Sequence, residues 1–157
     1  MTSVSPFLWF DDQAEQAAEL YVSLIPNSRI LSVRRYPDGA PQPPGTAMGV
    51  TFELDGLPVQ AFNGGPYFHH TEAFSMFVSV QTQDEVDRLW DALIGDGGAP
   101  SQCGWLKDRF GLSWQIVPTV LDDLLLDPDP ERAGRAMQAM LTMGKLDIAA
   151  LQAAADG

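Results

Sequence analysis

The sequence has a single cysteine, Cys103, among 157 residues, so an intrachain disulfide framework is excluded. Basic residues are also few: 9 Lys and Arg stand against 21 Asp and Glu, which gives a net charge of -12. An acidic surface repels phosphate backbones and anionic lipids, so we expect neither nucleic acid nor a membrane surface as partner. No apolar run approaches the roughly 20 residues needed to span a bilayer.

The first residues, Met1 to Pro6, have neither the basic region nor the apolar stretch of a secretory signal. Together with the single cysteine, this favours a cytoplasmic location. Hydrophobic residues make up 45% of the chain, which is enough to bury a core. The length suits one compact domain, or two small modules that share a core.

One pattern occurs twice. Residues 56–62 read Gly-Leu-Pro-Val-Gln-Ala-Phe, and residues 111–117 read Gly-Leu-Ser-Trp-Gln-Ile-Val. Both copies have the alternation of a half-buried strand. Each follows an apolar strand-like run and an amphipathic helical run: 7–10 with 14–24 in the first half, and 74–80 with 86–94 in the second. This duplication predicts two similar α+β halves facing a shared cleft, where function should lie.

The remaining pattern predicts further elements. Asp12 with Glu15 predicts a capping box at the start of the first helix. Further strands are expected at 29–36, 47–54 and 57–63, then at 101–102, 105–107 and 112–117. Asp55-Gly56 predicts a hairpin turn. After Pro118 the chain reads as helical, with Asp129-Pro130 opening a helix that carries Met137, Met140 and Met143 on its apolar face.

Several long motifs carry a family resemblance. They lie at 6–11, 25–30, 62–66, 103–108, 111–118 and 143–151. The chain resembles the PhnB-like family, often labelled 3-demethylubiquinone-9 3-methyltransferase. That family belongs to the vicinal-oxygen-chelate superfamily of glyoxalases, bleomycin-resistance proteins and dioxygenases. The resemblance implies an α+β fold of two βαβββ modules that form a curled mixed sheet, and a homodimer. We expect one domain, 1–157, made of a first module (6–66), a second module (73–118) and a helical tail (119–157).

The resemblance also bears on metal binding. In metal-using relatives, a histidine on the opening strand and a glutamate on the closing strand of each module hold a divalent ion. The glutamate lies four residues after the turn glycine, and here those places hold Gln60 and Gln115. The opening strands offer only apolar side chains at the histidine places: Phe7, Leu8, Phe74 and Met76. A neutral amide and a hydrocarbon are poor ligands for a divalent ion, so we expect no metal and no cofactor.

The glutamines are the leading candidate ligand contacts, because a primary amide both donates and accepts hydrogen bonds. The alternative is that they only satisfy backbone groups. Four aromatic side chains could form apolar walls, or could be plain core: Trp9, Phe62, Phe74 and Trp105. Lys107 could hold an anionic group, whereas Arg109 reads better as a solvated hairpin residue.

Three functions remain open. The favoured one is a metal-free, small-molecule-binding protein of the superfamily. A second is an enzyme acting on a small oxygenated or quinone-like substrate, with His69, His70, Lys107 or Cys103 as candidate groups. A third is a structural homodimer without ligand. The methyltransferase label has no support, because neither Gly-rich segment joins a strand to a helix as a nucleotide-type methyl donor requires.

Overall fold

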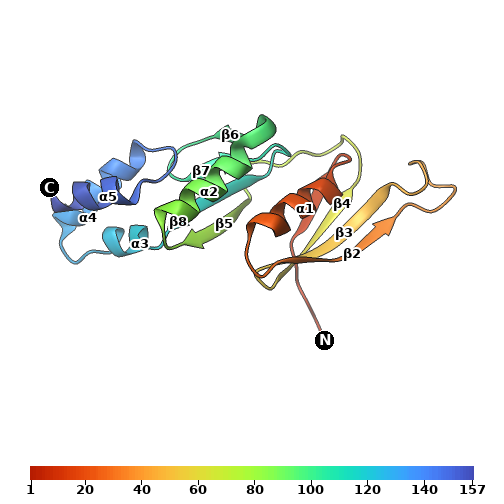
Figure 1. The fold of residues 1–157 in the computed structure, drawn as a ribbon, viewed down its shortest axis with the longest axis horizontal. Coiled ribbons are helices and arrows are strands. Elements are labelled where there is room, and N and C mark those ends of the chain that lie inside the picture. The colour runs from red at the N-terminus through yellow and green to blue at the C-terminus, as the bar shows by residue number, and fades with distance from the viewer. The chain divides into compact units, whose positions relative to one another are not determined.

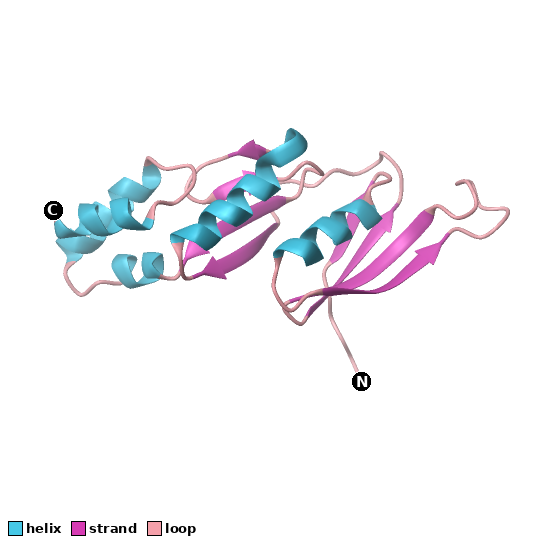
Figure 2. Ribbon diagram, in the orientation of Figure 1, coloured by secondary structure: helices cyan, strands magenta, loops and turns pink.

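The computed structural model describes all residues, 1–157, and divides into two compact units, Met1–His70 and Thr71–Gly157 (Figure 1). Each unit contains a four-stranded mixed sheet with a helix packed on one face (Figure 2). This is the predicted α+β class. None of the helices has both the length and the apolar character that crossing a membrane requires.

The first unit is a βαβββ module. Its elements are β1 (Phe7–Phe10), α1 (Ala14–Leu24), β2 (Arg29–Arg35), β3 (Ala47–Leu54) and β4 (Leu57–Asn63). The strand order is β1-β4-β3-β2, with β1 parallel to β4 and the other pairs antiparallel. The alternation of β4 sets its two faces, since Val59 and Ala61 are buried whereas Gln60 and Phe62 are only half-buried. We call the sheet face opposite the helix the open face.

The predicted hairpin between β3 and β4 is confirmed. Asp55 and Gly56 both have positive φ, at 48° and 81°. Two successive residues in this region make a type I′ turn, whose twist matches that of the flanking strands. Glycine reaches this conformation without steric cost, and aspartate tolerates it better than most residues.

The start of α1 differs from the prediction. No Asp12–Glu15 capping box forms, because the N-cap residue is Gln13 and no side chain of the cap accepts a hydrogen bond. Instead, the buried Asn63 at the end of β4 accepts from the backbone N–H of Ala14 through Oδ1, at 2.8 Å. Its Nδ2 donates to the carbonyl of Ala47 at 3.0 Å. A residue distant in sequence therefore caps this helix and ties it to β3.

The second unit repeats the module. Its elements are β5 (Ser75–Val80), α2 (Gln83–Ile94), the 3-10 turn η1 (Gly95–Gly97), β6 (Ala99–Pro100), β7 (Trp105–Lys107) and β8 (Ser113–Pro118), in the sheet order β5-β8-β7-β6. The strand predicted at 101–102 was wrong, since β6 precedes it. Gln102 accepts from the N–H of Trp105 at 3.0 Å and belongs to a tight turn. In that turn Cys103 and Gly104 both have positive φ.

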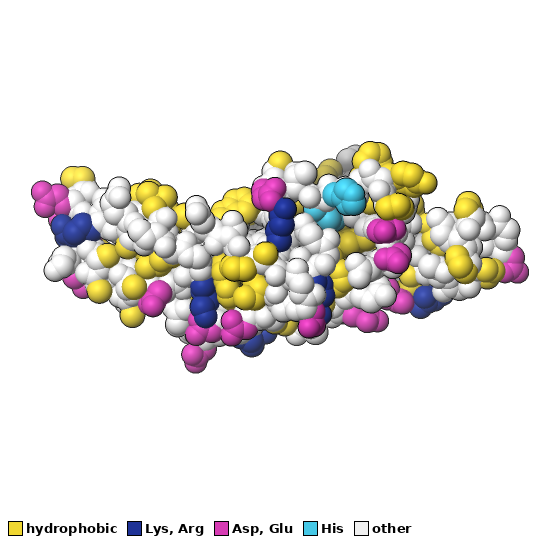
Figure 3. All heavy atoms as spheres, turned by 90° about the horizontal axis from the view of Figure 1, so that it is seen from above, with side chains coloured by type: hydrophobic (Ala, Val, Ile, Leu, Met, Phe, Trp, Pro, Cys, Tyr) yellow, Lys and Arg dark blue, Asp and Glu magenta, His cyan; other side chains and the backbone are white.

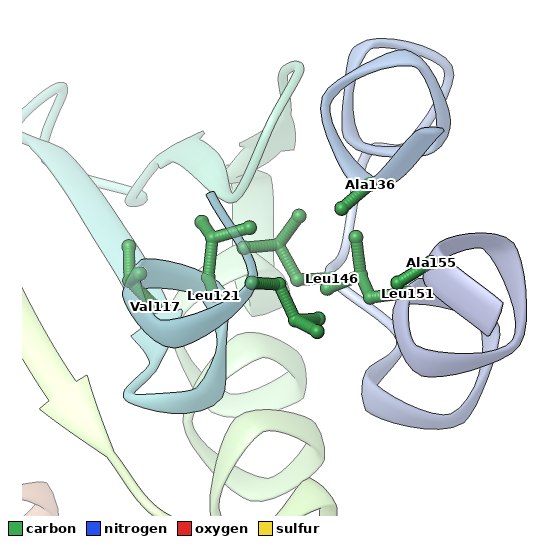
Figure 4. Close-up of a cluster of buried hydrophobic side chains, with 7 residues drawn as sticks. Val117, Leu121, Ala136, Leu146, Leu151 and Ala155 are labelled. Atoms are coloured by element: carbon green, nitrogen blue, oxygen red, sulfur yellow. The ribbon is translucent and has the colours of Figure 1, made fainter. Parts of the chain in front are cut away.

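Three helices follow β8: α3 (Val120–Leu125), α4 (Pro130–Leu141) and α5 (Ile148–Asp156). As predicted, a helix opens at Asp129-Pro130, and the structure adds that Asp129 caps α4, accepting from the N–H of Glu131 at 2.9 Å. Their buried side chains form one cluster with the end of β8, shown in Figure 4: Val117, Leu121, Leu124, Ala136, Leu146, Leu151 and Ala155. The methionine stripe divides here, because Met140 and Met143 pack on the cluster whereas Met137 is exposed.

Within the second unit, backbone hydrogen bonds join the tail to the turn between β6 and β7. The N–H groups of Cys103 and Gly104 donate to the carbonyls of Met143 and Gly144, both at 2.8 Å. Gly104 has a φ of +86°, and a Cβ there would lie 3.0 Å from both Leu146 and the carbonyl oxygen of Ile116. Only glycine therefore fits at this junction without strain.

Candidate functional site

The two repeated glutamines occupy equivalent places in their sheets. Gln60 on β4 is the parallel partner of Phe7 on β1, and Gln115 on β8 is the parallel partner of Phe77 on β5. Both amides are half-buried on the open face. The neighbouring positions face the helix, as the alternation predicted: Trp114 and Ile116 in the second unit are buried.

Each glutamine makes the same hydrogen bond. Gln60 Nε2 donates to Ser5 Oγ at 3.1 Å, and Gln115 Nε2 donates to Ser75 Oγ at 2.9 Å. Each serine lies two residues before the phenylalanine that pairs with the glutamine. A serine hydroxyl accepts and donates equally well, so the amide can present either its oxygen or its NH₂ group outward. The Gln60 and Gln115 amides are thus held in the same arrangement, each with one polar group free to bind a ligand.

Aromatic side chains lie on the same sheet face as Gln60. The ring of Phe62 lies 5.2 Å from that of Trp9 and 5.8 Å from that of Phe7, measured between centroids. Phe68 meets the edge of Trp9 at 5.0 Å. The indole Nε1 of Trp9 donates to the carbonyl of Gly65 at 2.9 Å, which fixes the ring. Two predicted wall residues, Trp9 and Phe62, are therefore in mutual contact beside Gln60 on the open face.

The second unit differs at one predicted position. Phe74 lies before β5, in a turn where its N–H donates to the carbonyl of Thr71, and it does not pair with Gln115. The aromatic neighbour of Gln115 on β5 is Phe77, which is 58% exposed. Trp105 pairs with Gln115 from the other side, on β7. The spacing Ser-x-Phe, common to 5–7 and 75–77, is the sequence signal that would have identified Phe77.

Lys107 lies in the same sheet, where it pairs with Ser113 across β7 and β8. Its Nζ contacts the carboxylate of Glu72 at 2.5 Å. This hydrogen bond is the main reason that the pKa of Glu72 is lowered from its usual range. A cavity of about 180 Å³ is lined by residues of β6, β7 and β8, and Glu72, Lys107 and Ser113 contribute to its walls.

The other candidate groups lie apart from these sites. Arg109 is not the solvated hairpin residue expected, because its NH1 pairs with Asp96 at 3.0 Å and its NH2 donates to the carbonyl of Ala92 at 3.3 Å. It stabilises the carboxyl end of α2. His70 packs edge-on to Phe10 at 5.2 Å, and Figure 3 shows histidine atoms at the surface. Cys103 is half-buried in its turn.

These residues do not fit a divalent ion. No three His, Cys, Asp or Glu side chains gather where they could share a metal. The glutamate places hold Gln60 and Gln115, whose amides are already bonded to serine. Neither Gly-rich segment joins a strand to a helix, as the site of a nucleotide-type methyl donor would require. Gly95–Gly97 follows helix α2, and the segment after Asn63 leads into irregular chain.

Sequence reasoning missed one buried carboxylate. Asp108 is 2% exposed and accepts three hydrogen bonds, from the N–H of Phe110, the N–H of Leu112 and the indole Nε1 of Trp114, at 2.9, 3.0 and 2.9 Å. It organises the turn into β8. In the sequence, this role of Asp108 is indicated only by its position three residues before the turn glycine Gly111 and six before Trp114.

The repeated βαβββ module with an open face defines the vicinal-oxygen-chelate superfamily. The matching family model, 3-demethylubiquinone-9 3-methyltransferase, covers residues 2–117, and the chain belongs to this PhnB-like family. A PhnB protein from Bacillus cereus, described as a putative member, is 31% identical over 75% of this chain and 100% of its own, with a TM-score of 0.69.

More distant structures share the fold. Protein PA1353 from Pseudomonas aeruginosa is 20% identical, over 75% of this chain and 98% of its own, with a TM-score of 0.62. The fosfomycin resistance protein FosX from Listeria monocytogenes, in a form complexed with Mn(II) and sulfate, is 15% identical over 80% of this chain and 96% of its own, with a TM-score of 0.52. No curated protein matches the chain.

Proposed function

We propose that this protein binds a small organic molecule without a metal, using the open faces of its two modules. The observation that supports this is the recurrence of one arrangement, in which serine holds a glutamine amide beside an exposed phenylalanine. Core packing alone gives no reason to keep both polar groups half-exposed next to Phe7 and Phe77, which are 56% and 58% exposed.

The side chains indicate the ligand class. Aromatic faces such as Trp9 and Phe62 favour a flat ring, and the amide favours oxygen substituents that accept or donate hydrogen bonds. The net charge of -12 opposes a highly anionic ligand. We therefore propose a planar, oxygenated molecule of the quinone or hydroquinone type that is not highly anionic, to which the family name also points.

Titration with a dimethoxy-substituted hydroquinone, kept reduced by dithiol, tests this proposal. The side-chain amide signals of Gln60 and Gln115 are expected to shift in a saturable way in ¹⁵N NMR spectra. Gln60→Ala and Gln115→Ala are each expected to weaken binding by about 3- to 10-fold, the effect of losing one hydrogen bond.

Two controls sharpen the experiment. Gln102→Ala alters an exposed glutamine of a turn and is expected to leave the affinity unchanged. Protein treated with EDTA should bind as well as untreated protein. Unshifted Gln60 and Gln115 amides, or binding that needs an added divalent ion, would refute the proposal.

We further propose that the protein is a cytoplasmic homodimer. The family resemblance supports the dimer, and so do the exposed apolar residues of the tail, among them Leu126, Met137 and Leu141. The single cysteine supports the cytoplasmic location. Light scattering at micromolar concentration is expected to give twice the chain mass of 17.1 kDa. Leu141→Glu should then shift the mass toward that of one chain, and a single-chain mass for the wild type would contradict the proposal.

A further inference from the structure

The cavity lined by residues of β6, β7 and β8 has in its wall Ser113, whose hydroxyl group finds no partner in the protein. Ser113 is 1% exposed, its Oγ is buried, and this oxygen has no hydrogen-bond partner. A buried hydroxyl without a partner costs free energy comparable to a lost hydrogen bond. Because Ser113 helps to line the cavity of about 180 Å³, a bound molecule there can supply the missing partner.

The cation beside this hydroxyl is already paired with a carboxylate. Lys107 is the direct cross-strand partner of Ser113, so both side chains lie on the open face of the second sheet. The carboxylate of Glu72 sits on Lys107 Nζ, yet the Glu72 side chain is 65% exposed. An exposed ion pair of this kind is worth little, so a competing anion can replace it.

We propose that this cavity is a subsite for a small carboxylate, which takes the place of Glu72 on Lys107 and accepts a hydrogen bond from Ser113. Its substituent would lie against the apolar walls formed by Pro100 and Trp105. Lys107 is the one cationic side chain that lines the cavity, and the protein has a net charge of -12. Both favour a monoanion over a phosphate dianion.

The first module has no such subsite, although it has the same topology. Pro58 corresponds to Ser113, because each lies two positions before the glutamine of its module. Glu53 corresponds to Lys107, because each is the cross-strand partner of that residue. Glu53 pairs with Arg29 and carries the opposite charge to Lys107. The subsite therefore distinguishes the second module from the first. It deepens the proposed function, since it adds an acidic substituent to the ligand read by Gln115.

Titration with propanoate, followed by the indole N–H signal of Trp105, tests the subsite. The signal is expected to shift in a saturable way, whereas the neutral isostere propanamide has no effect. Glu72→Gln removes the competing carboxylate and is expected to tighten propanoate binding about 2- to 5-fold. Ser113→Ala should weaken it about 2- to 10-fold, and Lys107→Gln should abolish it.

Asp87→Asn is the matched control, because Asp87 pairs with Lys145 in the same unit and the charge change is equal. It is expected to leave propanoate binding unchanged. Binding that Glu72→Gln does not tighten, or phosphate binding more tightly than propanoate, would overturn the subsite. If propanoate fails while the hydroquinone still shifts Gln60 and Gln115, the subsite is wrong and the proposed function stands; the reverse result removes the proposed function alone.

Discussion

Replacing Asp108 by alanine is expected to lower the free energy of unfolding by about 3–5 kcal/mol, measured by urea denaturation. The carboxylate accepts from two backbone N–H groups and from the indole of Trp114, and all of these lie in or next to the core strand β8. Alanine leaves the buried donors without a partner, and each such group costs about 1–3 kcal/mol.

A double-mutant cycle separates this effect from lost packing. Asp108→Asn keeps an oxygen for the two backbone donors, but it turns an NH₂ group toward the Trp114 indole, which is also a donor. Trp114→Phe removes that donor. The double variant is expected to be more stable than the sum of the single effects implies, because the clash of donors is gone. Strict additivity would show that the Asp108–Trp114 hydrogen bond contributes nothing.

Replacing Asn63 by alanine is expected to cost about 2–4 kcal/mol. Its two hydrogen bonds satisfy the N–H of Ala14, in the first turn of α1, and the carbonyl of Ala47, at the start of β3. Since α1 has no cap of its own, alanine leaves one buried donor and one buried acceptor unpaired. The second readout is hydrogen exchange at the Ala14 amide, which should become faster.

Asn63→Asp is the matched variant for this position. A carboxylate still accepts from Ala14 and is favoured at a helix N-terminus, but it faces the carbonyl of Ala47 with no proton to donate. We therefore expect the exchange of the Ala14 amide to stay slow while the protein is still destabilised. Fast exchange at Ala14 in both variants would mean that Asn63 does not act as the helix cap.

The two proposals imply a division of roles within the duplicated fold. The glutamine, serine and phenylalanine recur in both modules and read features that any oxygenated aromatic ligand shares. Lys107 and Ser113 occur only in the second module, where Glu53 and Pro58 stand in the first. The repeated module supplies the common frame, and two cross-strand positions differ between the halves, so that Lys107 in the second module stands where the first has Glu53.

Much of this architecture could be predicted because it rests on short-range patterns. The repeat at 56–62 and 111–117 identified both closing strands, and the period of alternation placed Gln60 and Gln115 on the face opposite the helices. The Asp55-Gly56 turn and the helix start at Asp129-Pro130 also follow from local rules. The strand predicted from Phe74 onward begins at Ser75 instead. Where β5 begins depends on its pairing with β8, and the residues of β5 alone do not reveal that pairing.

The sequence by itself determined the internal repeat, the alternation of each strand and the glutamine at equivalent places of both closing strands, since these depend only on residue type and spacing. Only the tertiary structure decided which distant groups meet. Asn63 caps α1 and Asp108 meets the Trp114 indole. Gln115 bonds Ser75, and Glu72 covers Lys107 beside the unsatisfied Ser113. These contacts depend on strand register, and register is set by the packing of the whole sheet against its helix.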